Sequence, residues 1–350
     1  MGSLPPEIVE ACVPIAIGMA LFWLVQPLVF RCFLVHQTLP WRLAAALWYG
    51  ATMYYLAHAL REALGEYYSF NVNLIWWVYA LISVKYVHAV LSPTFGAELG
   101  LTSWSRIALF CYLPATVIFD SKPSSTQQQH SALFYLARGL VQLVVMGQVA
   151  QTVLAYRLDE RLPLWAHSLV AYYQIMLSQG GFADVAFSAP TRMIVGPRVR
   201  IEEPSDAPAR ATVPRYFWAR WSKCAGYHLR TAIYERWGGR RNQWTATAAT
   251  FGLNCVLHIT WWGYVSAGKL AWNYIPLLFT IPLTNLWLDK YVLVPYVKHY
   301  SVALYHTVGW LVLQAMVVYA MPHFLDAQGL PKTLHELCLL QSGRLSKTYF

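Results

Sequence analysis

Residues 11–35, ACVPIAIGMALFWLVQPLVFRCFLV, form an apolar run in which Arg31 carries the only formal charge. A helix needs about 20 mostly apolar residues to cross the roughly 30 Å hydrocarbon core of a bilayer, so this run is long enough to span it. It is far longer than a membrane β-strand and lacks the alternation of polar and apolar residues that such strands show. The run therefore predicts a transmembrane helix.

The rest of the chain repeats this pattern. Of the 350 residues, 57% are hydrophobic and 12% are charged, which is too apolar for a water-soluble protein of this size. We predict eight transmembrane helices, at residues 11–35, 39–60, 73–92, 132–155, 162–184, 244–265, 270–296 and 302–322. The expected fold class is an all-α, polytopic membrane protein.

Two shorter features refine this plan. The apolar piece at 104–118 is short and contains Pro114, so we predict a re-entrant or interfacial segment there. No positive charge precedes the span at 11–35, so we expect that span to be retained and not cleaved as a signal peptide. The six cysteines form no CxxC pair and no metal-ligand spacing, so neither a disulfide framework nor a metal site is predicted.

The net charge of +10 is concentrated in one segment. Residues 190–242 hold 11 Lys or Arg against 4 Asp or Glu. Basic segments beside spans lie on the cytosolic face, near anionic lipid headgroups, so the lipid bilayer is the expected partner and nucleic acid is not. Alternation through eight spans then places both termini in the lumen. We divide the chain into N-terminal helices with the re-entrant segment (1–130), a core containing this basic loop (131–326) and a C-terminal tail (327–350).

The basic loop has internal structure. IEEPSDAPARATVP, residues 201–214, has no helical or strand period and predicts a linker. RYFWARWSKCAGYHLRTAIYERW, residues 215–237, has apolar residues at spacings of three and four and predicts an amphipathic helix. Trp218, Trp221 and Trp237 suit the headgroup level, so we expect this helix in the cytosolic interface. A plain membrane anchor is the alternative interpretation.

His258 stands near the middle of FGLNCVLHITWWGYV, residues 251–265, which has no formal charge. At 1.5 Å per residue from a helix start near Trp244, it lies about 21 Å into the membrane. An ionisable group at that depth indicates a functional site. Asn254 is one turn earlier on the same helix face. The alternative is that Asn254 and His258 only hold two helices together.

The order of these parts resembles the wax synthase branch of the membrane-bound O-acyltransferases. In that branch a segment F-W-x-R-x-W-(N/H) precedes a span F-x-x-S-G-x-x-H. The matching residues here are Phe217, Trp218 and Arg220, and then Phe251, Leu253, Leu257 and His258. Residues 305–326 are similar to the closing span of that family. The chain departs from the pattern at Ser222 and Lys223 in the first motif, and at Asn254 and Cys255 in the second.

The resemblance implies an enzyme that transfers an acetyl or longer acyl group from CoA to a hydroxyl of a hydrophobic acceptor. The acceptor class that it implies is a terpenoid or meroterpenoid of secondary metabolism, and the expected location is the endoplasmic reticulum membrane. Acyl-CoA is then a co-substrate, with no bound cofactor. His258 is the expected general base, and Asn254 would orient its ring or donate to the oxyanion. Four basic residues would hold the CoA phosphates: Arg215, Arg220, Lys223 and Arg230.

A membrane-bound terpene cyclase acting on a prenylated, epoxidised meroterpenoid is the alternative. Such an enzyme needs a carboxylic acid that protonates an olefin or an epoxide, and Asp184 and Asp289 are the candidates. The 16 Trp and 23 Tyr could shield the resulting cation. A transporter is less favoured, because the sequence shows no inverted repeat and no matched pair of broken helices.

Overall fold

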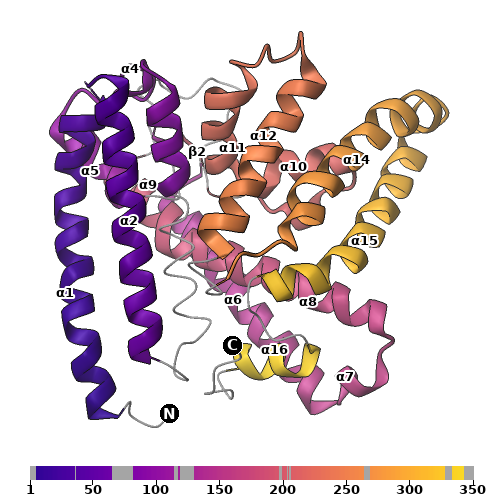
Figure 1. Ribbon diagram of the computed structural model, residues 1–350. Helices are drawn as coiled ribbons and strands as arrows, with labels where there is room; N and C mark the ends of the chain where they lie inside the picture. The colour runs from indigo at the N-terminus through magenta and orange to yellow at the C-terminus, as the bar shows by residue number, and fades with distance from the viewer. Residues whose placement is uncertain are drawn as a thin grey trace.

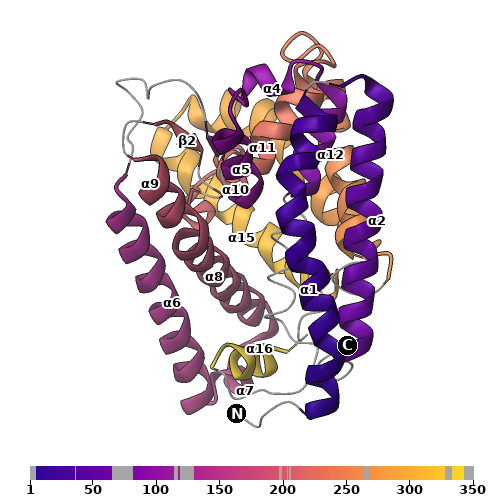
Figure 2. The ribbon, with the colours of Figure 1, turned by 90° about the vertical axis from the view of Figure 1, so that its left-hand side faces the viewer.

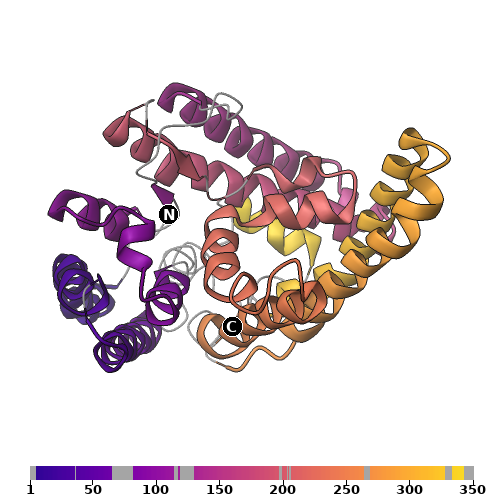
Figure 3. The same cartoon turned by 90° about the horizontal axis from the view of Figure 1, so that it is seen from above.

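The computed structural model describes residues 5–35, 37–64, 82–113, 117–118, 130–196, 199–202, 204, 206–263, 269–327 and 333–342. Within these ranges nearly every element is a helix, which confirms the all-α class. Seen from above, three groups occupy three sides of the molecule: the N-terminal helices, the pair formed by α6 (Ala132–Ala155) and α8 (Leu164–Ala183), and the C-terminal helices (Figure 3).

The N-terminal helices form one packed group, drawn in indigo and purple in Figure 1. Its elements are α1 (Pro6–Val29) with the π-helical turn η1 (Phe30–Val35), α2 (Leu39–Leu64), a helix over Ile82–Leu91, α4 (Phe95–Glu98) and α5 (Trp104–Tyr112). Aromatic rings make its core. The ring of Tyr86 stacks on Tyr49 with centroids 4.3 Å apart and meets the edge of Phe30 at 4.7 Å.

The second group consists of α6 (Ala132–Ala155), α7 (Leu158–Arg161) and α8 (Leu164–Ala183), and α8 continues through η3 (Asp184–Ser188) into α9 (Ala189–Val195). Helices α6 and α8 run side by side (Figure 2). Glycine makes their close approach possible, because a Cβ at Gly139 would lie 2.8 Å from the carbonyl oxygen of Gly181. The face of α8 that is turned away from α6 is therefore fixed by this crossing.

The basic loop is more structured than predicted. Its linker contains strand β2 (Ile201–Glu202), which pairs antiparallel with β1 (Val117–Ile118), and the 3-10 turn η4 (Pro208–Arg210). The predicted amphipathic helix is divided into α10 (Pro214–Trp221), α11 (Lys223–Leu229) and the π-helical turn η5 (Arg230–Tyr234). The single-helix prediction is wrong at Ser222, whose extended backbone (φ −142°, ψ 84°) ends α10 and starts α11.

The C-terminal helices complete the fold. They are α12 (Gln243–Leu257) with η6 (His258–Trp262), η7 (Pro276–Thr280), α14 (Ile281–Leu288), η8 (Asp289–Lys298), α15 (Val302–Ala327) and α16 (Leu334–Gln341). Helix α10 packs against α14 and α15, and α16 packs against α6 and α8. The basic loop, the group formed by α6 to α9 and the C-terminal helices thus meet around α8, α10, α12 and α15.

Four helices of the described part are long and apolar enough to cross a membrane: Pro6–Val35, Ala132–Ala155, Pro276–Lys298 and Val302–Ala327. They correspond to four of the eight predicted spans and support an integral membrane protein. Helix α2 is long enough but is not among these four. The predicted span at 73–92 lies partly outside the described residues. Eight spans therefore stay a prediction.

Candidate active site

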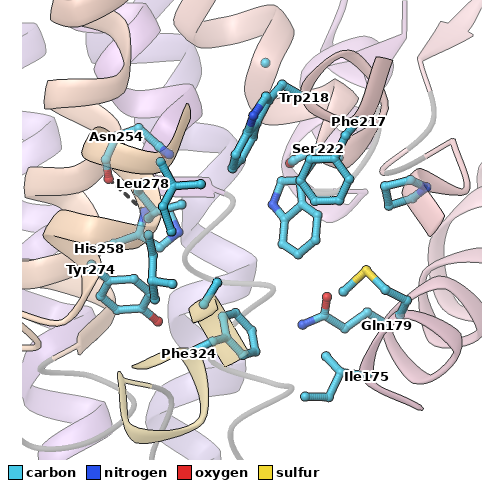
Figure 4. A pocket seen from close by; sticks show the side chains of 18 of the residues that line it. Ile175, Gln179, Phe217, Trp218, Ser222, Asn254, His258, Tyr274, Leu278 and Phe324 are labelled. Atoms are coloured by element: carbon cyan, nitrogen blue, oxygen red, sulfur yellow. Dashed lines mark hydrogen bonds between the residues drawn. The ribbon is translucent and has the colours of Figure 1, made fainter. Parts of the chain in front are cut away.

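An apolar cavity of about 250 Å³ lies between α8, α10, α11, α12, α14 and α15 (Figure 4). Much of its wall is aromatic, from Phe217, Trp218, Trp221, Phe251, Tyr274 and Phe324. The remaining polar lining consists of Tyr172, Gln179, Ser222, Thr250, Asn254 and His258. No charged side chain occurs among the described residues that line it, so the cavity suits a neutral molecule.

His258 lies in the wall of this cavity and is 8% exposed. It begins the π-helical turn η6 at the end of α12, and such turns are frequent at functional sites. Its Nδ1 is 2.7 Å from the carbonyl oxygen of Asn254. A carbonyl only accepts hydrogen bonds, so Nδ1 carries the proton and, in a neutral ring, Nε2 has the lone pair. The ring also packs against Tyr274 in a T-shaped arrangement, with centroids 5.0 Å apart.

Asn254 contacts the His258 ring through its backbone, whereas the sequence predicted a contact through its side chain. Its backbone carbonyl orients the imidazole, whereas its side-chain amide lies in the cavity wall (Figure 4). This hydrogen bond of His258 is made within its own helix, so it does not join two helices. The geometry leaves the Asn254 side chain in the same cavity wall as the His258 ring.

Three of the four aromatic residues of α10 face inward: Phe217, Trp218 and Trp221 line the cavity, whereas Tyr216 is 43% exposed. Of the three predicted headgroup tryptophans, only Trp237 is among the strongly exposed side chains. The rings of Trp218 and Phe251 pack in a T-shaped arrangement, with centroids 5.7 Å apart. Each of these two residues belongs to a different motif of the family resemblance, so the two motifs meet in one wall.

The four basic residues predicted to bind CoA do not line the cavity, and each is paired with an acid. The nitrogen-to-oxygen distances are 2.5 Å for Arg215–Asp289, 3.8 Å for Arg220–Asp206, 2.9 Å for Lys223–Glu202 and 3.1 Å for Arg230–Glu235. The partners of Arg215 and Lys223 are mostly buried, which indicates structural pairs. Arg220 and Arg230 pair with exposed acids, and such weak pairs leave them accessible to an anion.

The two candidate acids of the cyclase alternative lie outside the cavity wall. Both oxygens of Asp184 accept hydrogen bonds from the Arg138 guanidinium, at 2.6 and 2.7 Å. Asp289 accepts one from Arg215 at 2.5 Å and one from the Tyr305 hydroxyl at 2.7 Å. The oxygens of both side chains are thus occupied by partners outside the cavity wall. This arrangement does not suit a proton donor to a substrate in the cavity.

Sequence reasoning missed a polar cluster on the other face of α11. The Nδ1 atoms of His88 and His228 are 2.9 Å apart, and Nε2 of His88 is 3.2 Å from Glu98. Ser92 links this carboxylate to Arg236 through hydrogen bonds of 2.9 Å each. Both imidazoles are fully buried. Helix α11 also lines the cavity, through Ala225, Gly226 and Leu229. The contact between His228 and His88 therefore connects that wall of the cavity to the N-terminal helices.

Burial sets the charge of this cluster. Desolvation, with His88 and Lys85 nearby, holds the pKa of His228 well below its ordinary value of 6.5. Desolvation alone would raise the pKa of Glu98, but hydrogen bonds from Thr94 and Ser92 and the His88 ring hold it below its usual range. At neutral pH the cluster therefore contains an ionised Glu98 and a neutral His228, with His88 between them.

We expect acidification to destabilise the protein through His228. Below about pH 6.5 the unfolded chain binds a proton at this imidazole and the folded chain does not, so the free energy of unfolding falls as the pH falls. In a His228→Asn variant, the free energy of unfolding should change less steeply with pH, by up to about 1.4 kcal/mol per pH unit. Thermal unfolding followed by tryptophan fluorescence between pH 5 and 7.5 measures both slopes. Parallel slopes for the two proteins would contradict the assignment.

Gln179, another residue of the cavity, is visible as a candidate in the sequence. It is a polar position in an apolar helical stripe of the predicted span 162–184. The long-range pair of His88 and His228 had no comparable signal. No family model matches the chain, and no curated protein matches it, so the likeness to wax synthases rests on the motif residues alone.

Proposed function

We propose that this protein is an integral membrane O-acyltransferase that moves an acyl group from acyl-CoA to a hydroxyl of a hydrophobic acceptor held in the cavity. The observation that supports it best is His258, an imidazole fixed through Nδ1 in the wall of a cavity without charged lining. A base so placed has its lone pair on Nε2, as removal of a hydroxyl proton requires.

The proposed reaction balances with these groups. Nε2 of His258 takes the hydroxyl proton while the acceptor oxygen attacks the thioester carbonyl carbon. The resulting oxyanion accepts a hydrogen bond from the Asn254 amide. The carbon–sulfur bond then breaks, and the CoA thiolate leaves with the proton from the imidazolium. An ester and free CoA result, and His258 is neutral again.

The cavity lining supports the acceptor class. A surface of aromatic and aliphatic groups with few polar atoms favours a neutral apolar alcohol, such as a terpenoid or meroterpenoid. From the family resemblance alone, we also propose that the enzyme resides in the endoplasmic reticulum membrane and acts in secondary metabolism. Acid-initiated cyclisation has less support, because neither Asp184 nor Asp289 lines the cavity.

The test is a product analysis in microsomes that contain the protein. Acetyl-CoA and a terpenoid alcohol are supplied in one reaction, and a prenylated epoxide without CoA in a second. Mass spectrometry should find an acetyl ester in the first reaction only. An isomer of the epoxide in the second reaction would instead support the cyclase.

A further prediction concerns the acyl donor. Changing both Arg220 and Arg230 to Gln should raise the KM for acyl-CoA several-fold without changing kcat, because the two side chains are exposed and weakly paired. The effect should shrink at high salt, where surface charges are screened. Arg157 and Arg161, in and beside α7 at the opposite end of the molecule (Figure 2), provide a matched double variant. Equal KM values for the two double variants would show that Arg220 and Arg230 do not bind acyl-CoA.

A further inference from the structure

One amide interrupts the apolar stripe that α8 presents to the cavity. The stripe consists of Tyr172, Ile175, Met176, Gln179, Gly180 and Ala183, at the spacings of one helix face. Gln179 is the only member with an amide, which offers two donor hydrogens and an acceptor oxygen. In Figure 4 this amide points into the cavity from the wall opposite His258.

The packing of α8 fixes this orientation. On its other side, α8 meets α6 so closely that a Cβ at Gly181 would lie 2.9 Å from the carbonyl oxygen of Gly139. Gln174 faces α6, where its amide meets Met146 O at 3.1 Å and Ala150 N at 3.0 Å in the orientation that satisfies both. The side chain of Gln179 is partly buried and is hydrogen-bonded to no other residue that the structure describes. Its amide is therefore turned toward whatever occupies the cavity.

A ligand that fills the cavity removes water from the Gln179 amide, and this costs free energy unless the ligand supplies a hydrogen-bond partner. The lining carries no charge, so a neutral oxygen of the occupant is the matching partner. We propose that Gln179 is a specificity-determining residue that donates a hydrogen bond to a second oxygen of the acceptor, at the end remote from the hydroxyl at His258. The inferred acceptor is a rigid, neutral, multi-ring alcohol with oxygen functions at both ends. A rigid body loses less entropy than a flexible chain when two ends are bound.

This inference rests on the proposed function for the hydroxyl end only, and a binding measurement tests it without any acyl donor. The probes are two tritiated steroids, 3β-hydroxyandrost-5-en-17-one and the same alcohol without the 17-ketone. Their Kd values are measured by equilibrium dialysis against the purified full-length protein in detergent. The wild-type protein should bind the ketone about three- to tenfold more tightly, as one hydrogen bond to a neutral acceptor predicts.

The Gln179→Leu variant should bind the ketone-free steroid as the wild type does and show no preference for the ketone. Gln151→Leu, an exposed position on α6, is the matched control and should keep the preference. Equal binding of both steroids by the wild type would mean that water alone satisfies the amide, and it would overturn the proposal. So would a preference that persists in Gln179→Leu, or the absence of binding of either steroid.

The two proposals fail separately. One outcome is a ketone preference that depends on Gln179, with no acyl transfer in the microsomal assay. It would contradict the transferase proposal and support the role of Gln179 in specificity. The converse outcome is acyl transfer that depends on His258, with equal Kd values for the two steroids. It would contradict the specificity role of Gln179 and support the transferase proposal.

Discussion

His258→Ala is expected to lower the turnover number by about two to four orders of magnitude, the usual contribution of a positioned general base. The imidazole is the only ring nitrogen base in the cavity lining among the described residues, and its Nδ1 hydrogen bond fixes Nε2 as the atom that takes the proton. Alanine is well tolerated in a helix, so membrane insertion and expression should be kept. The assay is acyl transfer in microsomes, normalised to the amount of folded protein.

His323→Ala is the matched control. This imidazole lies on α15 beside the Tyr319 ring and does not line the cavity, so its removal should leave the turnover number nearly unchanged. Wild-type activity of His258→Ala would remove the general-base role. Loss of folded protein in that variant alone would favour a packing role for the ring.

Asp184→Asn should lower the free energy of unfolding by about 3 kcal/mol, because it leaves the Arg138 guanidinium without its bidentate carboxylate. The Asp184 side chain is only 4% exposed, so water cannot readily replace the lost partner. The turnover number per folded molecule should change little, since Asp184 does not line the cavity. Unfolding in detergent, followed by tryptophan fluorescence, gives the stability, and the microsomal assay gives the turnover.

Glu160→Gln provides the comparison. Its partner Arg157 is also an arginine, but the Glu160 side chain is 53% exposed, so the loss of this pair should cost less than about 1 kcal/mol. If Asp184→Asn instead abolished a CoA-independent activity while stability stayed constant, Asp184 would be a proton donor and the cyclase alternative would replace the transferase.

The membrane class followed from local composition. A hydrocarbon environment requires about 20 consecutive apolar residues in a self-satisfied helix, and that requirement is visible in runs such as 11–35 and 132–155. The nearness of Asn254 to His258 is likewise local, because residues four apart share a helix face. Even so, the sequence pointed to the Asn254 amide, whereas the backbone carbonyl holds the ring.

Only the tertiary structure decided what each helix face meets. A period of 3.6 residues shows which side chains lie together, but the same stripe can face lipid, headgroups or a cavity. The inward direction of Trp218 depends on α10 packing against α14 and α15. The pairing of Asp184 with Arg138 and the approach of His88 to His228 join residues 46 and 140 positions apart. Such contacts depend on how helices rotate and cross, which long-range packing determines and no local pattern records.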